Sequence, residues 1–122
     1  MAAEIKNEKG MIRISNSVIA KLAGYAATKC YGVVGMAARS GKDGIAMLLK
    51  KESIDKGVKV KVTEDVIDIA LYVIMEYGVN VSTVGDIVKS NVKYQVEEQT
   101  GMKVGSVTVN VESIRVNYDI RI

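Results

Sequence analysis

Residues 67–77 have the sequence Ile-Asp-Ile-Ala-Leu-Tyr-Val-Ile-Met-Glu-Tyr. Every second side chain, from Ile67 to Tyr77, is apolar or aromatic, whereas the alternate positions include Asp68 and Glu76. A period of two that persists over such a stretch is typical of a β-strand with one buried face. The stretch therefore predicts a long strand with one buried face.

Shorter strands are predicted upstream of this one. Residues 58–62 alternate valine with lysine, which indicates a half-buried strand, and Glu64-Asp65 is suited to a hairpin turn between the two. Residues 10–14 and 32–36 combine glycine with a short apolar run and predict two further strands.

Two stretches lack a regular pattern. Residues 1–9 are polar and are expected to be frayed. Residues 38–56 contain Gly41 and Gly44 and only a short apolar run. We expect them to form a mobile loop with room for one helical turn.

A first helix is predicted after Ser15 or Ser17, since either hydroxyl can accept a hydrogen bond from the backbone at a helix start. Gly24 would weaken this helix by about 1 kcal/mol relative to alanine, unless close packing requires it. The small residues around it favour close packing. The apolar stripe predicted from helical spacing comprises Val18, Leu22, Tyr25 and Ala26, and Ile19 and Ala23 broaden it.

The C-terminal part predicts a second helix and a last strand. Asn80 or Ser82 is placed to begin the helix, and Gly101 is placed to end it in the left-handed conformation. Apolar residues then alternate from Val104, and the phase of the alternation shifts near Ser113. A β-bulge or bend is expected there.

These elements follow the order βαββαβ. That order favours an α+β fold, a two-layer sandwich in which two helices pack on one face of a mostly antiparallel sheet. The length of 122 residues suits one domain, and no internal repeat or linker divides it. We therefore expect a single domain over residues 1–122.

Composition excludes several kinds of chemistry. The chain has no histidine and one cysteine, Cys30, so it lacks the residues for a Ser-His-Asp triad, a zinc ribbon or an iron–sulfur cluster. We expect no cofactor, no metal and no catalytic residues. The lone Cys30 cannot form an internal disulfide and is expected at the edge of the core. The N-terminus lacks a signal-peptide core, which predicts a cytoplasmic protein without direct membrane insertion.

Two glycine motifs resemble ligand-binding loops. Residues 35–43 imitate a phosphate-binding loop, but five residues separate its glycines and Asp43 stands where a hydroxyl is needed. Gly32-Val-Val-Gly35 has the glycine spacing of the loop that clamps single-stranded RNA in KH domains. Because its central residues are apolar, a tight bend that enters a strand explains this motif better.

Charge is unevenly distributed. Residues 39–61 carry a net charge of +4 and include Arg39, Lys42, Lys50 and Lys51, whereas residues 64–98 carry −5. The two stretches are either solvated surfaces or sites where neighbouring copies meet head to tail. The basic stretch has no aromatic residue for base stacking, so nucleic acid is not the expected partner.

Tyr72 and Ile74 lie on the more polar side of the long strand. If that side is open, they form an apolar patch of the kind that contacts other proteins. The alternative is that residues 38–56 of the same chain cover them. Together with Arg39, Lys42, Lys50 and Lys51, they constitute the interaction surface predicted from the sequence.

Several blocks together resemble the alkaline shock protein family of Gram-positive bacteria, also called the envelope stress response or general stress protein family. The blocks, which extend over about residues 9–116, include Gly10-Met-Ile-Arg-Ile-Ser, Gly57-Val-Lys-Val-Lys-Val, the stretch from Ile67 to Gly78, and Val96-Glu-Glu-Gln-Thr-Gly-Met-Lys-Val. The resemblance implies a cytoplasmic protein without known catalysis that serves cell-envelope homeostasis. It also implies self-association and, for some members, a membrane-anchored protein partner that holds them at the inner face of the membrane.

The leading hypothesis is thus a non-enzymatic, self-associating interaction module. Two alternatives remain open at this point. One is an accessory subunit of a lipid-metabolic enzyme, because relatives are linked to several pathways. The other is a KH-like module that binds single-stranded RNA through Gly32 to Gly35 and nearby lysines.

Overall fold

Strand β5 (Val66–Glu76) is the centre of the main sheet in the computed structural model, which describes residues 2–38 and 48–116. Strand β4 (Val58–Thr63) pairs antiparallel with the first half of β5. Strand β3 (Val33–Met36) pairs antiparallel with the second half. The two short strands therefore lie end to end along one edge of β5.

Strand β6 (Lys103–Arg115) occupies the other edge of β5 and runs parallel to it. A parallel neighbour needs a crossover connection, and helix α2 (Val81–Thr100) provides it. The register of the pair shifts where Val111 and then Ser113 are the successive partners of β5. This irregularity confirms the bulge predicted near Ser113.

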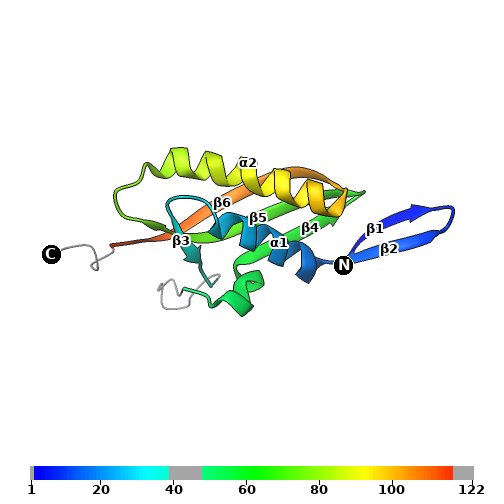
Figure 1. The fold of residues 1–122 in the computed structure, drawn as a ribbon, viewed down its shortest axis with the longest axis horizontal. Coiled ribbons are helices and arrows are strands. Elements are labelled where there is room, and N and C mark those ends of the chain that lie inside the picture. Colours follow the sequence, from blue (N-terminus) through cyan, green and yellow to red (C-terminus); the bar gives the residue numbers. More distant parts are fainter. Residues whose placement is uncertain (1, 39–47, 117–122) are drawn as a thin grey trace.

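Helix α1 (Asn16–Thr28) and helix α2 lie side by side over the same face of the sheet (Figure 1). The core forms between them and the sheet. From β5 it takes the alternate residues Ile67, Ile69, Leu71, Val73 and Met75, and from α2 the stripe Val84, Val88, Val92 and Val96. The predicted α+β class, with two helices on one face of a mostly antiparallel sheet, is confirmed. None of the helices among the described residues is long and apolar enough to cross a bilayer.

Local signals explain where these elements begin and end. The Ser15 hydroxyl and the Asn80 side-chain carbonyl each accept a hydrogen bond from a backbone N–H in the first turn of their helix. Gly101 ends α2 in the left-handed conformation, with φ +74°. Glu64 and Asp65 both have positive φ, as a tight hairpin turn between β4 and β5 requires.

The prediction of a frayed N-terminus is wrong. Strand β1 (Ala2–Asn7) pairs antiparallel with strand β2 (Gly10–Ser15), and the resulting hairpin projects from the body of the molecule (Figure 1). The strand predicted over residues 10–14 exists, but it belongs to this two-stranded sheet and not to the main one.

Apolar residues that alternate with polar ones attach the hairpin to the core. Ala3 lies opposite Ile14, and Ile5 lies opposite Ile12, so the four share one face. Ala3 is fully buried, and Ile5 and Ile14 pack against the core. The base of the hairpin is therefore held by the rest of the protein, which the polar composition of residues 1–9 conceals.

Part of the predicted loop over residues 38–56 is helical. The 3-10 helix η1 (Lys51–Gly57) precedes β4, and its Ile54 is buried. The helical turn expected within this stretch is therefore confirmed, and η1 holds this part of it against the core. The prediction of a mobile loop for residues 39–47 lies outside the described residues.

Gly24 allows α1 to approach η1 closely. A Cβ at Gly24 would overlap with Cγ2 of Ile54 and would lie 3.4 Å from a methyl carbon of Val58. Ile54 is β-branched and buried, so it has little freedom to move aside. Close packing, the explanation that the sequence favours, is thus confirmed.

We expect Gly24→Ala to lower the free energy of unfolding by about 1–3 kcal/mol, because overlap with Ile54 outweighs the gain in helix propensity. Gly85→Ala is the matched control. Its Cβ would meet nothing within 4 Å, so it should raise the free energy of unfolding by up to about 1 kcal/mol. Urea denaturation of both variants measures this, and equal effects of the two substitutions would contradict it.

Candidate interaction surface

The apolar patch predicted around Tyr72 and Ile74 is not open. Ile74 is completely buried and Tyr72 is half-buried. Gly35 of β3 lies opposite Ile74, and the Leu48 side chain fills the space into which a Cβ of Gly35 would point. The backbone N–H of Ala37 also donates to the Tyr72 carbonyl at 2.8 Å. The prediction is therefore wrong for Ile74, because the same chain covers this part of the sheet.

The predicted basic residues are only partly placed. Arg39 and Lys42 lie outside the described residues. Lys50 and Lys51 are exposed at the start of η1. Among the four predicted residues that the structure describes, Lys50 and Lys51 are exposed, whereas Ile74 is buried and Tyr72 is half-buried.

Only one of the two glycine motifs lies fully within the described residues. Gly32 has φ +90° and leads directly into β3, and Gly35 lies inside that strand. The tight bend that enters a strand is therefore confirmed, and these residues do not form a free loop that could clamp RNA. The imitation of a phosphate-binding loop over residues 35–43 lies mostly outside the described residues.

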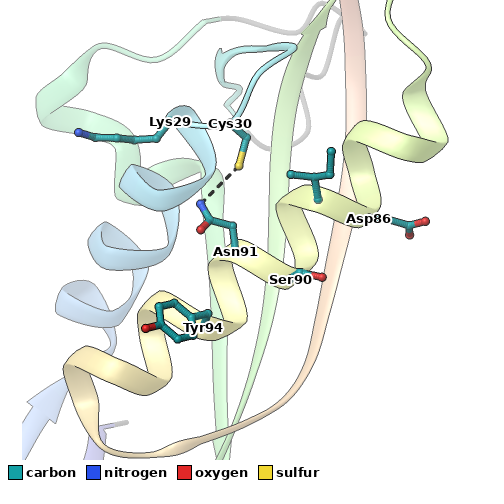
Figure 2. A pocket seen from close by; sticks show the side chains of 7 residues that line it. Lys29, Cys30, Asp86, Ser90, Asn91 and Tyr94 are labelled. Carbon is teal, nitrogen blue, oxygen red and sulfur yellow. Dashed lines mark hydrogen bonds between the residues drawn. The ribbon is translucent and has the colours of Figure 1, made fainter.

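A groove runs between the outer sides of α1 and α2 (Figure 2). We call it the inter-helix groove. Its two adjoining hollows share Lys29 and Asn91 in their walls. The remaining lining residues are Leu22, Tyr25, Ala26, Cys30, Asp86, Ile87, Ser90, Tyr94, Gln95 and Gln99.

Asn91 holds the two walls of this groove together. Its Nδ2 donates to the Ala26 carbonyl at 3.2 Å and to Cys30 Sγ at 3.5 Å. The Cys30 thiol in turn donates to the Ala26 carbonyl at 3.6 Å. The Ala26 carbonyl also accepts from the Lys29 backbone N–H at 3.3 Å, so Asn91 adds a bond from α2 to the last turn of α1. Cys30 is a small, buried residue at the core edge, as expected.

The outer wall of the groove is apolar and aromatic yet open to solvent. Tyr94 is 59% exposed, Ile87 51% and Tyr25 47%. Sequence spacing placed Tyr25 in the buried stripe of α1. The residues of α1 that are buried are Ile19, Ala20, Ala23, Gly24, Ala26 and Ala27. The predicted stripe is therefore confirmed for Ile19, Ala23 and Ala26, but it is wrong for Val18 and Tyr25, which are exposed.

A positive cluster borders one end of the groove. Lys29 Nζ lies 4.5 Å from the centroid of the Tyr25 ring, a cation–π geometry. A hydrogen bond with Lys29 and its positive charge lower the pKa of Tyr25, and the charge of Lys51 lowers it further. Lys51, predicted from the basic stretch, therefore acts beside Tyr25, which the charge pattern alone did not reveal.

The inter-helix groove presents chemical groups suited to protein recognition. Over residues 2–38 and 48–116, no three histidine, cysteine, aspartate or glutamate side chains gather as metal ligands. The inter-helix groove instead offers exposed aromatic rings, an aliphatic side chain, amides and a cation. Such a mixture fits the side chains of another protein.

Known proteins similar to this chain point to one family. The chain matches the model of the alkaline shock protein 23 family, described as having a cell envelope-related function, over residues 4–116. It is 43% identical to the "Uncharacterized protein YloU" of Bacillus subtilis (strain 168), a match that covers 95% of this chain and 98% of that protein. It is 41% identical to the "Uncharacterized protein Spy1614" of Streptococcus pyogenes serotype M6, over 95% of this chain and 97% of that protein.

More distant relatives carry a functional name. The chain is 29% identical to a protein of Streptococcus pyogenes serotype M3 named "Stress response regulator gls24 homolog", over 88% of this chain and 60% of that protein. No solved structure matches the chain.

We expect Lys29→Gln to raise the pKa of Tyr25 towards its usual value, because the ammonium that stabilises the tyrosinate is removed. Lys51→Gln should raise it less, since its charge makes the smaller contribution. A pH titration followed by NMR of ring-labelled tyrosine measures both shifts. An unchanged Tyr25 titration in Lys29→Gln would contradict the geometry.

Proposed function

This chain belongs to the alkaline shock protein 23 family, and from that membership we propose that it is a non-enzymatic protein-interaction module in cell-envelope homeostasis or stress response. The cell envelope-related function of the family supports the setting. The relatives named as stress response regulator homologues support a role in stress response. A chain without histidine and with one cysteine is poorly equipped for acid–base or nucleophilic catalysis, which supports the non-enzymatic role.

The inter-helix groove is the observation that carries this proposal. Exposed aromatic and apolar side chains usually mark contact surfaces when they gather beside a groove. Tyr25, Ile87 and Tyr94 are such side chains, and Asn91 of α2 fixes the groove by donating hydrogen bonds to Ala26 and Cys30 on the opposite wall. A partner side chain placed there would bury apolar surface without reorganising the fold.

We place the protein in the cytoplasm, at the inner face of the membrane through a membrane-anchored protein partner. The resemblance to the alkaline shock family supports this location. The lysines at the end of the groove, Lys29 and Lys51, support it as well, because positive charge is attracted to the anionic inner leaflet. This attraction would orient the groove towards a partner anchored there.

Capture experiments from solubilised envelope fractions test the groove. We expect Tyr94→Lys to lose the proteins captured by the unchanged chain, because a charge replaces an aromatic contact. Val18→Lys is the matched control, since Val18 is 48% exposed on α1 and does not line the groove. Mass spectrometry identifies the captured proteins. A partner retained equally by both variants would rule out the groove as its binding site.

The proposed module also associates with copies of itself. We expect size-exclusion chromatography with light scattering to show species heavier than the 13.2 kDa monomer as concentration rises. If opposite charges contribute to the contact, higher salt should reduce the mass. A strict monomer at every concentration and salt level would contradict self-association, while the groove could still bind a different protein.

A further inference from the structure

One edge of strand β6 is unpaired among the described residues. Among the described residues, β6 pairs only with β5, so the backbone groups on its other side have no strand to bond. The strand extends over Lys103–Arg115 and is the longest in the structure described. A long free edge is a ready template for another strand.

A trough lies beside that edge. Its lining combines valines with the polar residues Ser82, Asp86, Lys89 and Thr108. It is bounded by the N-terminal half of α2 and by the middle of β6, and we call it the edge groove. Val107, Val109 and Val111 are only half-buried there, and Val81 is 41% exposed. A Cβ at Gly85 would meet nothing within 4 Å, so the helix leaves room at this point. An added strand could therefore bond to β6 and bury alternate side chains under α2.

The β1–β2 hairpin has the matching pattern. Its apolar face carries Ile12, which is 58% exposed although Ile5 and Ile14 on the same face pack against the core. Its other face is polar and carries the Arg13–Glu4 ion pair at 3.1 Å. A two-stranded hairpin is marginally stable by itself, so it gains from joining a larger sheet.

We propose that the β1–β2 hairpin of one copy adds to the free edge of β6 in a second copy and places Ile12 in the edge groove. The proposal rests on the self-association described above and identifies the segments that make it. The apolar face of the hairpin then continues the helix-covered face of the sheet. Its polar face continues the opposite face, where Ser106 donates to Asp68 at 2.9 Å.

The contact has to be made between copies. The hairpin projects from the end of the molecule where α1 begins, whereas the edge groove lies towards the opposite end, at the start of α2 (Figure 1). Each copy therefore keeps one hairpin and one edge groove. Such a head-to-tail contact continues into an open chain, or into a ring if the rotation closes.

Charge contributes little to this contact. Residues 2–15 carry three basic and two acidic residues, while the charged residues that line the edge groove, Asp86 and Lys89, form an ion pair at 3.2 Å. The two surfaces therefore neither attract nor repel each other strongly. Hydrogen bonding along the strand and burial of Ile12 supply the main contributions.

Two substitutions test the two surfaces separately. Gly85→Leu fills the edge groove from open space and should not weaken the fold, because leucine is a better helix former than glycine. Gly85→Ala is its control, with the same backbone effect and an almost empty groove. Ile12→Lys removes the apolar side chain, and Met11→Lys is its control, since Met11 is 47% exposed on the opposite face of the hairpin.

We expect Gly85→Leu and Ile12→Lys each to weaken self-association about tenfold or more in light scattering, because the burial of an isoleucine is lost. The two controls should assemble like the unchanged chain. Circular dichroism melts verify that every variant is folded.

Mixing the two defective variants gives the sharpest outcome. Gly85→Leu keeps its hairpin and Ile12→Lys keeps its edge groove, so an equimolar mixture should form a one-to-one dimer that grows no further. Unimpaired assembly of both variants, or a mixture that stays monomeric, would overturn this contact while leaving self-association through another surface. An unchanged chain that never assembles would overturn both.

Discussion

Burial of every second side chain of β5 is the constraint on which this fold depends. Ile67, Ile69, Leu71, Val73 and Met75 are at most 2% exposed, and their backbone is paired on both edges. A strand so placed requires a layer of helices on one side and neighbours on each edge. The hairpin turn before it, the crossover helix after it and the short strand β3 all satisfy these requirements.

The same constraint decides which side chains and which strand edge stay exposed to a partner. The helices must turn their smallest or most apolar faces towards the sheet, which leaves Tyr25, Ile87 and Tyr94 on the outside. Both edges of β5 are paired with other strands, so the unpaired edge of the sheet lies on β6. The two candidate contact regions are therefore consequences of how the core is completed.

Sequence patterns predicted the regular elements well because each depends on local chemistry. The period of two in β5, the caps at Ser15, Asn80 and Gly101, and the phase shift near Ser113 are all properties of adjacent residues. The errors arose where tertiary packing decides. The small residues of α1 predicted its close packing, but which larger residues then point outward depends on that packing, so Val18 and Tyr25 were wrongly assigned to the buried stripe.

The candidate surface was harder to predict for the same reason. Tyr72 and Ile74 alternate correctly along β5, but Leu48, distant in sequence, covers their neighbourhood.

The parallel pairing of β6 with β5 affects how the chain reaches its native state. Val66 lies beside Lys103, so this pairing must await the whole crossover helix, whereas β4 and β5 meet across a two-residue turn. Contacts that are distant along the chain form slowly. During synthesis, β5 is therefore complete before its last neighbour has left the ribosome, and the nascent sheet must remain unpaired along that side until the C-terminal strand emerges.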